Sequence, residues 1–189
     1  MVNYPDIAEN LKNKQVLPHS INVFLVVYQV LSSATNIRLS RQEERDLLVA
    51  ALLHDIGKSS WPEYWFVQPG YLLGKEAITM MRMHSLQGAN LIKEAGLPEK
   101  VADIALQHHE RPGGTGYPLR EEPSYPALLL AACDVFCACT EDRPYRKHPL
   151  TQQDAIREVA KYAPVEVVKA LIEGRGERER FDKKRLAIE

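Results

Sequence analysis

The chain has 189 residues, of which 45% are hydrophobic and 26% are charged, and its formal net charge is -1. This length and composition predict one soluble globular domain that is large enough to bury a core. The near-zero charge gives no bias toward polyanions, so we expect neither a nucleic acid polymer nor a membrane as a partner.

The sequence favours a cytoplasmic protein. No run of about 18 uncharged apolar residues could span a bilayer, and the first ten residues lack the basic and apolar regions of a secretory signal. The three cysteines, Cys133, Cys137 and Cys139, lie in one seven-residue segment. An odd number of thiols on one segment argues against a disulfide framework, so we expect them to be buried and reduced.

The first third of the chain reads as three helices. Residues 10–15 are expected to form a short one. Residues 19–33 follow with valines at helical spacing, although their β-branched content leaves a strand possible. Ser40 and Glu43 have the spacing of a capping box, which predicts a helix that begins there and ends near Gly57.

The remaining elements are also predicted to be helical, separated by loops rich in glycine and proline. Loops are expected at 59–74 and 110–126, and no strand is predicted. The expected helices span 75–94 (closed by Gly96), 98–109, 127–140, 151–162 and 165–173. The chain should therefore fold as an all-α protein, a single helical bundle. Residues 176–189 form a mixed-charge tail, read as a solvated helix, a disordered end or a contact surface.

Several polar side chains occur in apolar surroundings on these helices. Five histidines and two aspartates share this property: His19, His54, Asp55, His84, His108, His109 and Asp134. Taken singly, such a histidine is usually a satisfied core residue, and a buried aspartate is usually a cap or a salt-bridge partner. Buried unpaired carboxylates are costly, however, and groups from separate helices can satisfy one another around a metal ion. Imidazole and carboxylate ligands suit iron, manganese or zinc.

These residues occur within a series of motifs. His19 is followed by "HDIGK" at 54–58, His84, "HHE" at 108–110, "GTGYP" at 114–118 and "DVFCACTEDRPYR" at 134–146. Over roughly residues 15–175 the chain resembles the HD-GYP domain, a subgroup of the HD metal-dependent phosphohydrolases. The resemblance implies an all-α bundle with bound iron or manganese that hydrolyses cyclic di-GMP. We accordingly assign residues 1–175 to one HD-GYP-like domain.

The resemblance also implies a role for each motif residue. One ion would be held by His19, His54, Asp55 and Asp134. Asp55 would bridge to a second ion held by His84 and His108, with His109 nearby. Family members with a third ion carry a glutamate where this chain has Gln15, so two divalent ions are expected.

Substrate contacts follow from the same resemblance. Lys58, Arg143 and Arg146 would face the phosphates, and Tyr117 would contact the nucleotide. Lys58 and Asp55 are thus the expected catalytic residues. Surface ion pairing remains the alternative for the two arginines, and loop packing remains the alternative for Tyr117.

The chain departs from the family pattern at two residues. Gly113 and Cys137 replace acidic residues of the motifs, and the connector between Pro118 and Asp134 is short. These departures could alter substrate placement or indicate a different activity. The aromatic residues after Lys58 either border the cleft or pack their loop on the bundle: Trp61, Tyr64, Trp65 and Phe66.

The predicted function is hydrolysis of cyclic di-GMP at a dinuclear metal site. One alternative is an HD phosphohydrolase for another nucleotide or phosphate ester. An alternative of another class is a non-catalytic signalling module that binds a nucleotide or a protein. Because no regulatory domain fits in 189 residues, regulation is expected from a signalling protein partner or an unseen segment.

Overall fold

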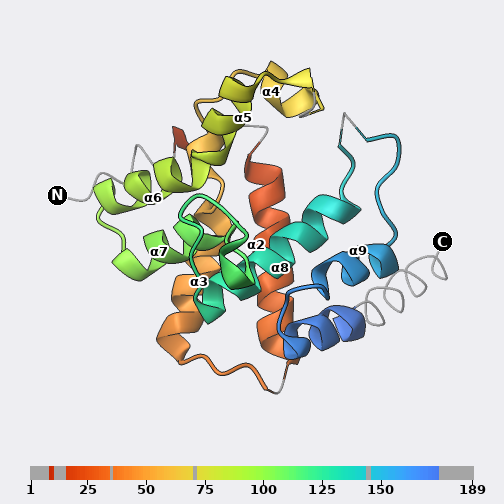
Figure 1. Cartoon of the computed structure of the whole chain (residues 1–189). Helices are drawn as coiled ribbons and strands as arrows, with labels where there is room; N and C mark the ends of the chain where they lie inside the picture. Colours follow the sequence, from red (N-terminus) through yellow and green to blue (C-terminus); the bar gives the residue numbers. More distant parts are fainter. Residues whose placement is uncertain (1–8, 11–15, 35, 70–71, 144–145, 175–189) are drawn as a thin grey trace, which may run out of the picture.

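The computed structural model describes residues 9–10, 16–34, 36–69, 72–143 and 146–174. The described chain is helical and contains no strand, which confirms the all-α prediction (Figure 1). Its elements are α2 (Leu17–Ser33), α3 (Arg41–Leu53), η1 (Ile56–Lys58), α4 (Tyr64–Val67), α5 (Lys75–Arg82), α6 (His84–Glu94), α7 (Glu99–Gln107), η3 (Pro112–Gly114), α8 (Tyr125–Thr140), α9 (Gln152–Val159) and a last helix at 165–174.

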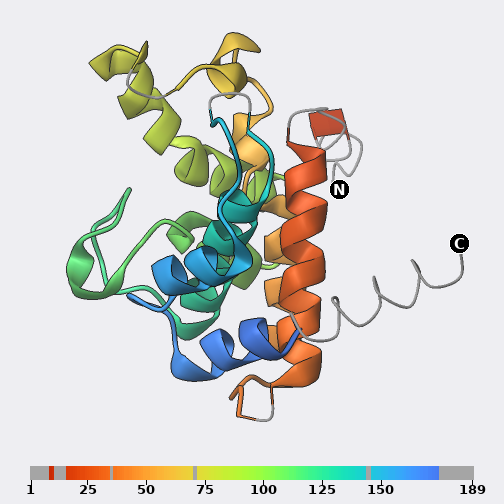
Figure 2. The ribbon, with the colours of Figure 1, turned by 90° about the vertical axis from the view of Figure 1, so that its right-hand side faces the viewer.

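The helix α8 is the centre of the bundle and packs against α2, α3, α7 and α9. Ten of its residues are buried, among them Asp134. The helix α2 runs along one side, and the loop between η3 and α8 projects on the side away from it (Figure 2). None of the described helices combines the length and the apolar character needed to cross a membrane.

Local signals explain where the first two helices lie. Val23, Val26, Val27 and Val30 are buried on one face of α2, which settles the choice between helix and strand in favour of the helix. The capping box is also confirmed. The Ser40 hydroxyl accepts a hydrogen bond from the Glu43 amide, and the Glu43 carboxylate accepts one from the Ser40 amide at 2.8 Å.

Some predicted boundaries were wrong. The single helix predicted at 75–94 is two helices, α5 and α6, which separate at Met83. The residues next to Met83 include no glycine or proline that would have predicted this break. The helix α5 buries no residue, whereas α6 packs closely against α7 and η1. One straight helix could not have its second half packed in the bundle and its first half in the observed exposed position. The predicted loop at 59–74 contains α4, and α9 ends at Val159 rather than near residue 162.

Gly96 follows α6 with a φ of 72° and closes this helix, as predicted. The predicted first helix at 10–15 falls almost entirely outside the described residues, and so does the tail at 176–189.

A close approach of two backbones positions the "HDIGK" motif. A Cβ at Gly57 would lie 2.1 Å from the His84 carbonyl oxygen and 2.7 Å from the Gly88 nitrogen. Only glycine therefore lets η1 pack directly on α6. This contact brings the end of α3 next to the start of α6, where His54, Asp55 and His84 lie.

Candidate metal centre

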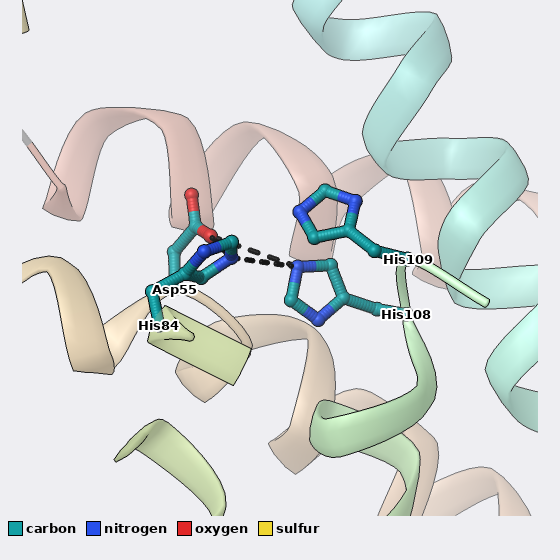
Figure 3. Close-up of side chains that lie close together, drawn as sticks. All are labelled: Asp55, His84, His108 and His109. Carbon is teal, nitrogen blue, oxygen red and sulfur yellow. Dashed lines mark hydrogen bonds and ion pairs between the residues drawn. The ribbon is translucent and has the colours of Figure 1, made fainter. Parts of the chain in front are cut away.

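The structure brings all seven predicted ligands together. They come from α2, from the ends of α3 and α7, from the start of α6 and from the middle of α8. Their ligand atoms form three groups in which all atoms lie within 4.8 Å of one another: Asp55, His84, His108 and His109; His19, His54 and Asp55; and His54, His108 and Asp134. The first group is shown in Figure 3. All of the seven are buried except His109, which is half-buried.

Asp55 lies between the groups, and its two oxygens face different partners. Oδ1 lies 3.3 Å from His84 Nε2 and 3.7 Å from His108 Nε2. Oδ2 lies 3.6 Å from His54 Nε2 and 2.6 Å from Lys58 Nζ. A carboxylate whose two oxygens face different partners can bind two neighbouring cations.

The histidine tautomers can be assigned from backbone contacts. Nδ1 of His54, His84 and His108 each lies at hydrogen-bond distance from the carbonyl oxygen three residues earlier. A carbonyl only accepts hydrogen bonds, so each Nδ1 carries the proton and each Nε2 presents a lone pair. Burial and the neighbouring His54 and His84 hold the pKa of His108 well below its usual value, so this imidazole stays neutral.

The converging lone pairs fit a divalent cation. Nε2 of His84 and Nε2 of His108 lie 3.3 Å apart, a contact that brings two lone pairs together. Nε2 of His54 and Oδ1 of Asp55 are buried and have no hydrogen-bond partner within the described part of the chain. Such groups are costly when unsatisfied. Divalent cations bound in these groups would satisfy all four atoms.

Glu141 supports the centre and was not predicted as a site residue. Its Oε2 lies 2.8 Å from His19 Nδ1, while His19 Nε2 lies 2.9 Å from Asp134 Oδ1. Burial alone would lower the pKa of His19. The contacts with Asp134 and Glu141 outweigh this effect and raise the pKa to about 9. A carboxylate on the outer nitrogen of a ligating histidine fixes the orientation of the ring. Asn22 and Arg143 donate to the same Glu141 carboxylate, at 2.7 and 2.9 Å.

A pocket of about 430 Å³ opens over four of the predicted ligands, namely His19, Asp55, His84 and His109. Lys58, Arg143 and Tyr117 contribute to its wall, as the substrate-contact prediction requires. The Tyr117 ring stacks on His109 with centroids 4.6 Å apart. Arg143 also pairs with Glu141, so the predicted surface ion pair and the predicted pocket position are both present.

Aromatic residues form another wall of this pocket. Trp61, Trp65 and Phe66 line it, and the Lys58 ammonium lies 5.5 Å from the Trp61 ring centroid. Tyr64 is 52% exposed and is not among the lining residues. Three of the four aromatics named from the sequence therefore border the cleft.

Arg146 lies elsewhere. Its guanidinium donates to the carbonyl oxygens of Ala138 and Cys139, at 3.2 and 2.9 Å. These carbonyls belong to the last turn of α8, whose acceptors need partners. Arg146 is not among the described residues that line the pocket. The structure thus places it as a cap of α8, and the predicted phosphate contact finds no support in this placement.

Glu110 holds the loop that carries Tyr117, a role the sequence did not reveal. Its carboxylate is fully buried and accepts hydrogen bonds from the amides of Leu119, Arg120 and Glu121. A Cβ at Gly116 would lie 2.4 Å from the Glu110 Cα. The loop therefore crosses close over residue 110, which sets Tyr117 against His109.

The two departures from the motif pattern do not touch the metal pocket. Gly113 has a φ of 72°, and a Cβ there would meet nothing within 4 Å. Cys137 is buried beside α2, where it borders a separate hollow with Asn22 and Phe136. Neither residue is among the described lining of the pocket over the predicted ligands.

Fold and site together define an all-α protein with a buried histidine and aspartate centre suited to divalent cations. The family model described as "HD domain" matches residues 10–167. The chain therefore belongs to the HD domain family.

Two relatives agree with this assignment. A protein named cyclic di-GMP phosphodiesterase from Pseudomonas aeruginosa is 37% identical over 149 residues, which cover 74% of this chain and 36% of that protein. Another of that name from Thermotoga maritima is 37% identical over 137 residues, covering 67% and 36%. The chain thus spans about a third of the length of these relatives.

A solved structure confirms the fold. The HD domain of the phosphodiesterase PgpH from L. monocytogenes, determined in complex with cyclic-di-AMP, superposes with a TM-score of 0.59 at 17% identity. The match covers 95% of this chain and 87% of that one. At this identity the likeness concerns the fold.

Proposed function

We propose that the chain is a metal-dependent phosphodiesterase that hydrolyses cyclic di-GMP. The observation that carries the proposal is the convergence of seven candidate ligands, four of which (His19, Asp55, His84 and His109) line a pocket whose wall also holds Lys58 and Arg143. The names of the two sequence relatives support the substrate.

The ligand arrangement supports two ions. His19, His54 and Asp134 would hold one, His84, His108 and His109 the other, and Asp55 would contact both through its separate oxygens. Mixed imidazole and carboxylate ligands suit iron or manganese. Bound divalent ions lower the pKa of water and neutralise phosphoryl charge, which is the chemistry that hydrolysis of a phosphodiester needs.

The remaining chemistry would come from side chains of the pocket. Lys58 lies beside Asp55, where its charge would stabilise the negative charge that grows on the phosphoryl oxygens. Arg143 would hold a phosphate oxygen pair through its planar guanidinium. Trp61 and Phe66 offer ring faces on which a guanine base could stack.

A second candidate is hydrolysis of another cyclic dinucleotide or phosphate ester, which the pocket chemistry would also allow. The cyclic-di-AMP complex of the PgpH domain favours this candidate. The non-catalytic binding module is less supported, because such a module has no need of buried lone pairs. The three cysteines of one helix, Cys133, Cys137 and Cys139, fit a reducing cytoplasm, where a signalling partner would regulate the protein.

The experiment is a substrate panel on protein purified without oxygen or chelator. Cyclic di-GMP, cyclic di-AMP and a one-phosphate diester are incubated with the wild type, with Asp55→Ala and with the surface control Asp103→Ala. The proposal expects cyclic di-GMP to be cleaved fastest, cleavage to be lost in Asp55→Ala, and the control to match the wild type. Faster cleavage of another ester would favour the second candidate, and no cleavage by metal-loaded protein would favour a binding module.

A further inference from the structure

Arg82 is a cationic residue of the pocket that the sequence did not single out. It is the last residue of α5 and lines the outer part of the pocket, where it is exposed to solvent. Its guanidinium carbon lies 5.5 Å from the centroid of the Tyr117 ring. This contact connects the end of α5 with the loop that follows α7, and both residues line the pocket.

The charge of Arg82 is available to a ligand, in contrast to the other cations of the pocket. Lys58 pairs with Asp55 at 2.6 Å, and Arg143 pairs with Glu141 at 2.9 Å. In the described part of the chain, no carboxylate forms an ion pair with Arg82. Its guanidinium contacts the face of the Tyr117 ring, which accepts no conventional hydrogen bond, so the guanidinium donors can turn to an anion in the pocket.

The position of Arg82 relative to the metal ligands limits what it can bind. His109 belongs to the ligand group, Tyr117 stacks on His109, and Arg82 lies over Tyr117. One aromatic ring therefore separates Arg82 from the metal centre. An anion at Arg82 would be a different group from the phosphate that is cleaved at the ions.

We propose that Arg82 binds the second, uncleaved phosphate of a cyclic dinucleotide whose other phosphate lies at the metal centre. This inference rests on the proposed function and adds a specificity determinant to it. A substrate with two phosphodiester anions would have one placed by the metal ions and the other by Arg82. The fork of guanidinium donors matches a pair of phosphate oxygens, and stacking on Tyr117 orients it before binding.

The test compares substrates with one and two phosphates. Steady-state kcat/KM is measured for cyclic di-GMP, cyclic di-AMP and bis(4-nitrophenyl) phosphate, whose molecule has one phosphate. The variants are Arg82→Ala, Arg82→Lys and the control Lys75→Ala, which removes the same charge from the exposed start of α5. Affinity for a phosphorothioate analogue of cyclic di-GMP is measured separately by equilibrium dialysis.

The expected result is a selective loss. In Arg82→Ala, the ratio of kcat/KM for cyclic di-GMP to that for the one-phosphate diester should fall about tenfold. This is the loss of affinity expected when one charged hydrogen-bonded pair is removed. The loss should appear in KM and in the analogue affinity, should be of similar size for cyclic di-AMP, and should be partly restored in Arg82→Lys. Lys75→Ala should keep the wild-type ratio.

Other results would overturn the assignment. A loss confined to cyclic di-GMP would mean that Arg82 recognises guanine, and an equal loss for the one-phosphate diester would mean a role at the metal centre. Unchanged analogue affinity in Arg82→Ala would refute any phosphate contact. Wild-type protein that binds the analogue but cleaves no cyclic dinucleotide would contradict the proposed function alone, whereas failure to bind the analogue would contradict the Arg82 site.

Discussion

The contact between η1 and α6 makes Gly57 the position where the smallest change should do the most damage. In Gly57→Ala the new Cβ would start 2.1 Å from the His84 carbonyl oxygen and 2.7 Å from the Gly88 nitrogen. Both are backbone atoms, so no side-chain rotation relieves the clash. Moving the first contact from 2.1 Å to beyond 3.0 Å separates η1 from α6 by about 0.9 Å.

This displacement predicts two effects. Overpacking of a tight interior contact costs about 1–3 kcal/mol, and the free energy of unfolding should fall by about 3 kcal/mol because backbone must move. The same shift moves Asp55 away from His84, whose ligand atoms lie 3.3 Å apart. Metal affinity should then fall about 10- to 100-fold, as it does when the support of a metal ligand is lost.

Urea unfolding in the presence of chelator measures the first effect, and metal titration of the chelator-free protein measures the second. Gly88→Ala should be intermediate, since its Cβ would meet the Gly57 nitrogen at 3.3 Å. Gly74→Ala is the matched control, because its Cβ would meet only the Glu76 carboxylate at 3.5 Å. If Gly57→Ala unfolds and binds metal as Gly74→Ala does, the contact between η1 and α6 does not position the ligands.

Three further changes test other parts of the structure. Glu141→Ala should weaken metal binding about 10-fold by releasing the outer nitrogen of His19, measured by competition with a chelator. Glu110→Gln should lower the free energy of unfolding by about 2–3 kcal/mol, because three amides lose a charged acceptor. Thr151→Ala should cost about 1 kcal/mol, since the Thr151 hydroxyl caps α9; urea unfolding measures both.

Each of these changes has a control nearby. Asp142→Ala should leave metal binding unaltered, and equal effects of the two substitutions would contradict a role for Glu141 at His19. Glu121→Gln changes an exposed side chain of the same loop, so stability equal to that of Glu110→Gln would argue against the buried anchor. Thr151→Ser keeps the hydroxyl, and a loss as large as in Thr151→Ala would show that the cap is unimportant.

The sequence predicted the elements whose signals are local. The buried valines of α2 and the Ser40 capping box depend on neighbours within one helix, and both were correct. The break at Met83 was missed because it depends on how α5 and α6 pack against other elements. No residue near Met83 has a backbone preference that would mark it.

The clustering of the candidate ligands was predictable for a related reason. A histidine or aspartate in an apolar helix is conspicuous, so His54 and Asp134 could be named as candidates from the sequence, and the structure brings their side chains together. Glu141 and Arg82 look like ordinary surface residues in the sequence, and only the tertiary contacts with His19 and Tyr117 give them roles. The contact of Arg146 with the end of α8 was not predicted, because it is set by the path of the intervening loop.

The proposed chemistry depends above all on two divalent ions, which the buried cluster would bind through Asp55. The most direct measurement is the metal content per chain, by elemental mass spectrometry, of wild type and Asp55→Ala purified without oxygen or chelator. We predict about two equivalents of iron or manganese in the wild type and a clear loss of both in the variant. Metal-free wild type, or a variant that keeps both ions, would contradict this prediction.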